Sequence, residues 1–531
     1  MNNDIHALKL HLKKETDINT LDKVERTALH LAASYNSQYI QQLLSFPGID
    51  VNKTEAVMKW TPLRYADRTK SWMAMDILLQ NGANPDDAVF TGHNAKAQEW
   101  GQAALWECAS KGHIKLLEFM LNCGVQVNAS VEVPENIHEK RTVLHRAICC
   151  GQVEVVRLIV SRGADINIRD ANKNTAFHFA AESGSVDIMK LLLDKEMPVN
   201  LTNTNGSEPI DISAKFGPLE TPKSPVEIGA AINSTNKDGD TPLMMAAYKS
   251  KLEIFRYLTE IGADINICNA KKNTVLHIAA ESGSVDIIKL LLDKGMCVNL
   301  AKASGSTPLH VSAKSGRLET VKALVERGAN INNTNKYGNT PLMAAAYSGE
   351  LEIFRYLTQE GADINIPNAK QNTAIHWASS SGSVDIIKLL LDEGMSVNLT
   401  NIDGTTPLHV SAKCGRLEAT KALVERGAAL DNANIHGITP LLMAAYYGKL
   451  EIFRYLMGKG ADINIRDAKN NTALHLASVS GSIDIIKLLL DEGMSVNLTN
   501  KDGSTPLHVS TKFGHPEASK TLVERGAALT L

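Results

Sequence analysis

The sequence predicts an all-α solenoid built from one repeated helix–turn–helix unit. A four-residue phrase of the type Thr-Pro-Leu-His recurs at spacings of 33 residues, or multiples of 33, from residue 142 onward. Between the phrases, segments such as GSVDIIKLLLDKG at 283–295 place apolar residues at helical spacing and end in glycine. A fixed period of this length is typical of stacked repeats whose core grows along one axis.

The composition is that of a folded, water-soluble chain. Of the 531 residues, 44% are hydrophobic and 21% charged, which excludes wholesale disorder, collagen and membrane barrels. The 55 Lys and Arg nearly balance the 58 Asp and Glu, so we expect no nucleic-acid partner. No apolar run suits a signal peptide or a membrane span, and we expect no direct membrane insertion. Seven cysteines without a CxxC pair favour a reducing compartment, which predicts a cytoplasmic location, with the nucleus as the alternative.

Fifteen phrases divide the chain into units that read helix, short turn, helix and loop. Nine of them have histidine in the fourth position: His30, His145, His178, His277, His310, His376, His409, His475 and His508. The other six are variants, namely TPLR at 61, AALW at 103, EPID at 208, TPLM at 241 and at 340, and TPLL at 439. From residue 175 onward three types of unit alternate, so that equivalent positions are 99 residues apart.

This unit resembles the ankyrin repeat, and the resemblance extends over 1–531. Thr307–His310 is followed by Gly316, by ALVERGA at 323–329 and by Asn332, and the same order recurs in most units. The resemblance implies an ankyrin-repeat solenoid, a curved superhelical stack of helix–turn–helix units with β-turn fingers. It also implies a monomeric protein that binds other proteins.

The regularity of the repeat divides the chain into four parts. We predict an N-terminal capping half repeat at 1–26, irregular repeats at 27–217, a weak seam at 218–227 and regular repeats in 99-residue blocks at 228–531. Extra residues at 86–101 and 130–140 lengthen two of the irregular units, and both insertions are expected to be surface loops.

Two prolines mark the predicted seam. Alignment with regular units places Pro222 and Pro225 in the middle of a second helix, where each proline removes a backbone donor and costs about 3 kcal/mol. This helix is therefore expected to be broken. The same unit has Glu208 and Asp211 where its equivalents have the threonine and histidine of the phrase. Because each unit contacts only its neighbours, one faulty unit should weaken the coupling between the parts on either side.

The row of histidines suggests a metal site or a proton relay, but a structural role explains it better. Stacked units lie about 8–10 Å apart, too far for two imidazoles to ligate one zinc ion. The resemblance implies that each histidine bonds the turn backbone and links adjacent units. No phosphate loop, HExxH or GxSxG is present, so we expect no enzyme, no metal and no cofactor. The adjacent Cys149 and Cys150 form either a redox switch or an ordinary packed pair.

Three asparagines suggest a modification site. Asn266, Asn365 and Asn464 end the strings LTEIGADIN, LTQEGADIN and LMGKGADIN. These strings resemble the site that an asparaginyl hydroxylase modifies in ankyrin repeats. Alternatively, the side chains bond the turn backbone, as asparagine does in loops. The two readings are compatible.

A patterned surface is the predicted binding site. In the ankyrin family, the residue seven positions after the threonine of each phrase faces the concave groove. At these positions residue types recur every three units, and the charged and aromatic ones are Glu182, Lys215, Tyr248, Glu281, Lys314, Tyr347, Lys413, Tyr446 and Lys512. On the fingers, Tyr337, Lys237 and Asp238 should flank them. Block duplication alone explains the pattern equally well, but tyrosines suit binding hot spots and lysines add charge.

We therefore expect a non-catalytic scaffold or adaptor that binds partner proteins on the concave groove. An extended, partly acidic partner with aromatic or apolar anchors would suit the surface. The alternatives are a phosphatase regulatory subunit or ubiquitin-ligase substrate receptor, the cytoplasmic ankyrin array of a larger channel-type protein, and a secreted effector of a bacterium or parasite.

Overall fold

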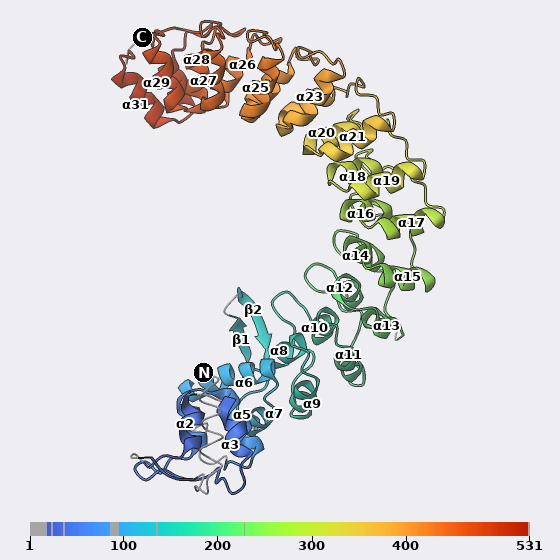
Figure 1. The fold of residues 1–531 in the computed structure, drawn as a ribbon, viewed down its shortest axis with the longest axis vertical. Helices are drawn as coiled ribbons and strands as arrows, with labels where there is room; N and C mark the ends of the chain where they lie inside the picture. The colour runs from blue at the N-terminus through green and yellow to red at the C-terminus, as the bar shows by residue number, and fades with distance from the viewer. Residues whose placement is uncertain are drawn as a thin grey trace. The chain divides into compact units, whose positions relative to one another are not determined.

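The chain forms two compact units, Met1–Asp264 and Ile265–Leu531, each a row of helix pairs (Figure 1). The computed structural model describes residues 19–22, 25–35, 38–84, 95–133, 136–227 and 229–528. The half repeat predicted at 1–26 lies mostly outside these residues. The boundary between the units comes after the predicted seam at 218–227.

Each phrase of the sequence lies in the first helix of one pair or at its start, which gives fifteen pairs in the described part of the chain. The first helices of unit 1 are α2 (Ala28–Tyr35), α4 (Pro62–Arg68), α6 (Ala95–Lys111), α8 (Val143–Cys149), α10 (Ala176–Ser183), α12 (Pro209–Phe216) and α14 (Pro242–Tyr248). Its second helices are α3 (Gln38–Leu44), α5 (Trp72–Gln80), α7 (Ile114–Asn122), α9 (Val153–Ser161), α11 (Val186–Leu193), α13 (Glu220–Glu227) and α15 (Leu252–Glu260).

Unit 2 continues the same alternation. Its first helices are α16 (Val275–Ser282), α18 (Pro308–Lys314), α20 (Pro341–Ser348), α22 (Ala374–Ser381), α24 (Pro407–Cys414), α26 (Pro440–Tyr446), α28 (Ala473–Ser480) and α30 (Pro506–Lys512). Its second helices are α17 (Val285–Asp293), α19 (Leu318–Glu326), α21 (Leu351–Gln359), α23 (Val384–Asp392), α25 (Leu417–Glu425), α27 (Leu450–Gly458), α29 (Ile483–Asp491) and α31 (Pro516–Glu524). In Figure 1, α16, α18 and α20 lie on one side of this unit and α17, α19 and α21 on the other.

The core of each pair is apolar and continues into the next pair. In the unit that begins at Thr307, Leu309, Val321 and Leu324 are fully buried. Helix α18 contacts both α19, its partner, and α20, the first helix of the next pair. Burying one such side chain contributes about 1.5–3 kcal/mol, so successive pairs stabilise one another.

The histidine of the phrase caps its own helix and bonds the next unit. The backbone N–H of Thr307 donates to Nδ1 of His310 at 3.2 Å, and the Thr307 hydroxyl lies 2.9 Å from the same nitrogen. Because Nδ1 accepts a hydrogen bond, it carries no hydrogen, so in the neutral ring the N–H is at Nε2, which donates to the carbonyl of Asn339 at 2.9 Å. His376 makes the equivalent bond to Thr405. The structural interpretation of the histidines is therefore confirmed.

The insertion at 130–140 contains a β-hairpin, so the expectation of a surface loop is wrong there. Strand β1 (Ser130–Val133) pairs antiparallel with β2 (Asn136–Thr142), with Ser130 opposite Thr142 and a register shift after Glu132. The segment SVEV alternates β-branched and polar residues, which favours a strand. This hairpin is the exception to the all-α prediction among the residues that the structure covers.

The other insertion is helical where it is described. Residues 95–101 were also expected to be a loop, but they form the start of α6. The segment AKAQEWGQAALWECASK is rich in Ala, Gln, Glu and Lys, which have high helix propensity, and this composition extends the first helix towards its N-terminus. Residues 85–94 lie outside the described part.

The expectation that prolines break the second helix of the seam is also wrong. Helix α13 begins at Glu220, so Pro222 lies in its first turn, where the missing N–H has no intrahelical acceptor. Only Pro225 lies in the helix interior. The phrase keeps a cap as well, because the Glu208 N–H donates to Oδ2 of Asp211 at 2.8 Å. Burial raises the pKa of the Asp211 carboxyl to about 7.

We expect stability to fall in mild acid because the linking histidines are buried. Burial lowers the pKa of four rings to about 4, those of His145, His277, His310 and His376. The unfolded chain binds these protons near pH 6.5, so stability is full above that pH and is lost as the pH falls towards 4. At about pH 5, each ring should lower the free energy of unfolding by about 1–2 kcal/mol relative to neutral pH. Urea denaturation followed by circular dichroism measures this.

His310→Met provides the control, because Met343 occupies the same place in the next unit. This variant should lose less stability between neutral pH and pH 5 than the wild-type chain does. A urea midpoint that does not change with pH in the wild-type chain would contradict the expectation.

The weak seam at 218–227 remains a prediction, and it now depends on Pro225 alone. Pro225 removes one helical hydrogen bond, so we expect 1–217 and 227–531 to unfold in separable transitions, with preferred proteolysis near 218–227. Pro222→Val/Pro225→Leu should slow this cleavage, as measured by limited trypsin digestion and mass spectrometry. The equivalent helix α19 is the internal control. A single transition that the double substitution does not change would contradict the seam.

Candidate protein-binding groove

The predicted row of tyrosines lies on the surface at the ends of first helices. Tyr248, Tyr347 and Tyr446 come at or near the ends of α14, α20 and α26 and are 50%, 48% and 40% exposed. Shortly before each tyrosine, alanines such as Ala345 and Ala346 are fully buried against neighbouring helices. The helix therefore turns one face to the core and presents a tyrosine to solvent. Large exposed aromatics in a regular row are typical of a protein-binding surface.

The other predicted groove positions are also accessible. Exposed side chains are those of Glu182, Glu281, Lys314, Lys413 and Lys512, and Lys215 is half-buried. On the fingers, Lys237 and Asp238 are exposed and Tyr337 is 64% exposed. These fingers are held by asparagine side chains: Asn335 Oδ1, for example, accepts the N–H of Tyr337 at 2.9 Å. The finger residues are thus presented on ordered turns.

The structure brings lysines and tyrosines of successive units together. Lys314 Nζ lies 5.9 Å from the ring centre of Tyr347, and Lys215 Nζ lies 6.0 Å from that of Tyr248. Such cation–π pairs contribute about 0.5–1 kcal/mol at exposed sites. In each of these two pairs the lysine and the tyrosine are therefore neighbours on the surface.

In the third block the pairing changes partner. Lys413 Nζ lies 5.4 Å from the ring of Tyr447, which packs edge-to-face on Tyr446 with centroids 4.9 Å apart. Sequence reasoning missed Tyr447, because it is one residue beyond the position taken to face the groove. A comparison of the three 99-residue blocks could have identified Tyr447, because its equivalents are Lys249 and Ser348 and the tyrosine is therefore a departure from the repeat.

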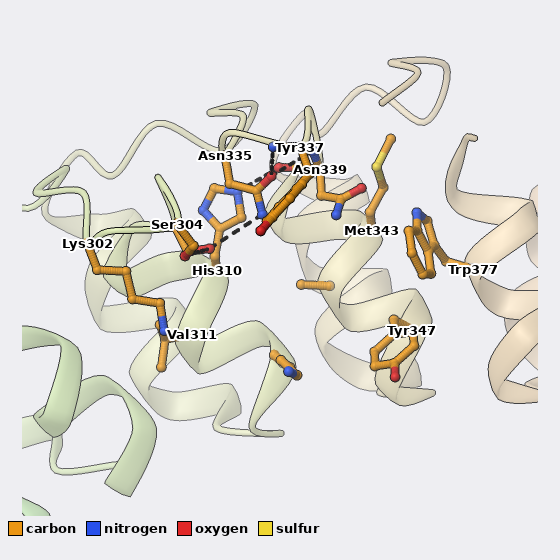
Figure 2. Close-up of a pocket in the computed structure, with 13 residues that line it drawn as sticks. Lys302, Ser304, His310, Val311, Asn335, Tyr337, Asn339, Met343, Tyr347 and Trp377 are labelled. Atoms are coloured by element: carbon orange, nitrogen blue, oxygen red, sulfur yellow. Dashed lines mark hydrogen bonds between the residues drawn. The ribbon is translucent and has the colours of Figure 1, made fainter. Parts of the chain in front are cut away.

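A hollow of about 390 Å³ opens in this surface in unit 2 (Figure 2). Its walls come from α18 and α20, from Trp377 on α22 and from two fingers, and include Lys302, Lys314, Tyr337 and Tyr347. Tyr347 packs edge-to-face on Trp377 with centroids 5.4 Å apart. Lys302 and Trp377 were not among the predicted site residues, because neither occupies the repeated groove position.

The three candidate hydroxylation sites are on the surface. Asn266, Asn365 and Asn464 are exposed. The backbone N–H of Asn365 donates to Oδ1 of Asp363 at 2.8 Å, so the turn is ordered by the aspartate that precedes the asparagine. In the preceding unit, Asn332 uses its side-chain oxygen to accept the N–H of Asp363 at 3.0 Å. Hydroxylation itself remains a prediction.

The cysteine pair does not favour redox chemistry. Cys149 and Cys150 are free thiols, and burial raises the pKa of the Cys149 thiol to about 11. A thiolate is the reactive form, so burial disfavours the reactive form of Cys149. Across the described ranges, no three His, Cys, Asp or Glu residues are grouped as a metal site. None of the helices in that part of the chain has the length and apolar character to cross a bilayer.

Comparison with known proteins agrees with the helix pairs. The family model described as "Ankyrin repeats (3 copies)" matches residues 1–89, 88–170, 167–224, 223–302, 252–335, 297–368, 375–467 and 441–531. The chain is also similar to the Homo sapiens protein "Transient receptor potential cation channel subfamily A member 1", with 27% identity over 168 residues. That match covers 31% of this chain and 14% of the channel subunit.

Proposed function

The chain belongs to the ankyrin repeat family, and on that premise we propose that it is a non-catalytic scaffold or adaptor. Ankyrin repeats form protein-interaction modules, and the fold is typically non-catalytic. The partner binds along the groove formed by the ends of the first helices and the fingers. The row of exposed tyrosines at Tyr248, Tyr347 and Tyr446 is the observation that supports this site.

The chemistry of the groove favours an extended, partly acidic partner. Tyrosines offer rigid contact area that a partner's apolar side chains can cover, and such residues are enriched in hot spots. The lysines beside them attract carboxylates and increase the association rate. Lys314 and Lys413 are exposed, so their charge is available to a partner. We further propose that the chain acts as a monomer in the cytoplasm or nucleus.

Substitution of the tyrosines tests this proposal. Tyr248→Ala/Tyr347→Ala/Tyr446→Ala should weaken partner binding by about 2 kcal/mol or more, because the change removes the anchors of the groove. Thermal stability should change little, since truncation of exposed side chains costs under about 0.5 kcal/mol each. The measurement is affinity capture from native cells with quantitative mass spectrometry, followed by titration of the captured partner.

The matched control changes three exposed lysines of second helices to alanine: Lys289, Lys388 and Lys487. This triple variant should capture the partner as the wild-type chain does. If the lysine variant loses the partner and the tyrosine variant keeps it, the binding site is on the outer face and the groove proposal is wrong.

A second candidate is the ankyrin array of a channel-type protein. The similarity to a cation channel subunit over 168 residues supports it. A longer transcript that encodes apolar segments of about 20 residues beyond Leu531 would favour this function. No described feature favours a phosphatase regulatory subunit, a ubiquitin-ligase receptor or a secreted effector over the general adaptor.

Hydroxylation of the unit-closing asparagines is a separate proposal. We expect co-expression with an asparaginyl hydroxylase to add one oxygen atom to Asn266, Asn365 or Asn464, because all three are exposed. Peptide mass spectrometry reports the change. Asn332, whose side chain bonds the next unit, is the internal control and should stay unmodified. Unmodified peptides at all three sites would rule the proposal out.

A further inference from the structure

The hollow in unit 2 differs from the rest of the repeat in a way that duplication does not explain. In a chain built from 99-residue copies, a wall residue should match its equivalents. Six of the thirteen wall residues do not, namely Lys302, Ser304, Tyr337, Asn339, Ala344 and Trp377. Of these, Lys302, Tyr337 and Trp377 add a charge or a large ring to the hollow. For example, Tyr337 is equivalent to Asp238 and His436. Lys302, Tyr337 and Trp377 come from two fingers and one helix, and in the folded chain they line the same hollow (Figure 2).

Trp377 gives the hollow an aromatic wall. The residues equivalent to it are Phe179, Ile278 and Leu476, so tryptophan is the exception. The ring packs edge-to-face on Tyr347 at 84°, and its Nε1 is buried without a hydrogen-bond partner among the described residues. Since an unmade hydrogen bond of this kind costs free energy, packing alone holds the indole here.

Lys302 replaces an asparagine that stabilises the finger in the other copies. Asn401 is typical: its Oδ1 accepts the N–H of Thr405 at 2.9 Å, and its Nδ2 donates to Oδ1 of Asn372 at 2.9 Å. The lysine side chain has no acceptor, so this turn keeps only its backbone bonds, such as that from the Lys302 N–H to the Ser306 carbonyl at 3.0 Å. As a result, Oδ1 of Asn273, the equivalent of Asn372, is buried without a partner in the described part of the chain.

The substitution therefore places a charge at the hollow and weakens the finger. Leaving a buried carbonyl oxygen unsatisfied costs free energy. Lys302 is half-buried, and burial lowers the pKa of its ammonium group. Glu281 interacts favourably with this charge, whereas Lys314 and Lys271 oppose it. The walls themselves contain two lysines and no carboxylate, so an anionic group would be attracted.

We propose that this hollow binds an aromatic side chain of an extended partner segment, with a flanking Asp or Glu side chain at Lys302. The proposal rests on the groove function above and names the chemistry of the partner. Tyr337, Tyr347 and Trp377 supply aromatic surface for the anchor, and Met343 and Val311 supply apolar surface. The carboxylate of the partner segment would form ion pairs with the ammonium groups of Lys302 and Lys314.

The test uses the full chain and three fluorescein-labelled peptides in one Gly-Ser background. Their central sequences are Glu-Glu-Phe-Glu-Glu, Glu-Glu-Ala-Glu-Glu and Lys-Lys-Phe-Lys-Lys. Fluorescence anisotropy should show saturable binding of the first peptide, at least about tenfold weaker binding of the second and no binding of the third. Absence of saturable binding of the first peptide up to about 1 mM would overturn the proposal.

Two variants restore the residues found in other copies. Lys302→Asn and Trp377→Leu should each weaken binding of the acidic Phe peptide at least about fivefold. Lys302→Asn should also raise the urea midpoint, because asparagine restores the side-chain hydrogen bonds of the turn and pairs with Asn273. A Lys302→Asn variant that binds the peptide more weakly but is more stable has lost binding without misfolding. Lys388→Asn, on a second helix, is the charge control and should change neither.

The outcomes distinguish this proposal from the groove function. If the peptide binds Lys302→Asn and Trp377→Leu as tightly as the wild-type chain, the hollow is not its site and the proposal is wrong. Capture of a native partner that depends on the three groove tyrosines would still support the groove. Loss of peptide binding in both variants, with the Lys388→Asn control unchanged, supports the hollow.

Discussion

The solenoid depends on the packing of each unit on the next, which buried histidines reinforce with a hydrogen bond to the finger of the following unit. His310 accepts from Thr307 at one ring nitrogen and donates to Asn339 at the other, so one neutral imidazole joins a helix start to its neighbour. Where the phrase has Met343 instead, the threonine cap remains, since Thr340 Oγ1 still accepts the Met343 N–H at 3.2 Å. The cap is thus the constant part of the unit and the histidine link is its addition. A stack with several such links tolerates the loss of one.

This division of roles leaves the binding surface free to change. The linking atoms belong to the start of the first helix and to backbone carbonyls of the finger, whose side chains are not needed for the bond. Equivalent second helices of the 99-residue blocks have almost the same sequence, as in VDIIKLLLD of α17 and α23. Fingers and the ends of first helices vary more between the blocks. Side chains such as Tyr337 and Tyr347 can therefore diverge without disturbing the stack. The proposed binding residues thus occupy positions that the fold does not constrain.

The sequence predicts those elements that the repeat itself determines, and it does not predict those that depend on a local helix start or on residues of several units. The 33-residue period predicted the helix pairs, and the resemblance to ankyrin repeats predicted the exposed tyrosines. The intact α13 was not predicted, since a proline in a first turn costs little and the position of the helix start decides the outcome. The hollow was not predicted either, because its walls come from positions of three units. Lys302 and Trp377 become visible only when equivalent residues are compared and then placed in space.

Departure from the repeat is not by itself a sign of function, and two cases show the difference. Asp211 replaces a linking histidine, but its carboxyl is buried, its pKa is raised by that burial, and it remains engaged in capping its own helix. Lys302 also replaces a stabilising residue, yet it is only half-buried and lines an aromatic hollow with a second lysine. Asp211 thus affects the coupling between units, whereas Lys302 offers a charge to an external ligand. Lys302 lowers the stability of its finger and leaves a charge beside an open, apolar hollow. Binding of a partner to that charge and that hollow can offset the loss of stability.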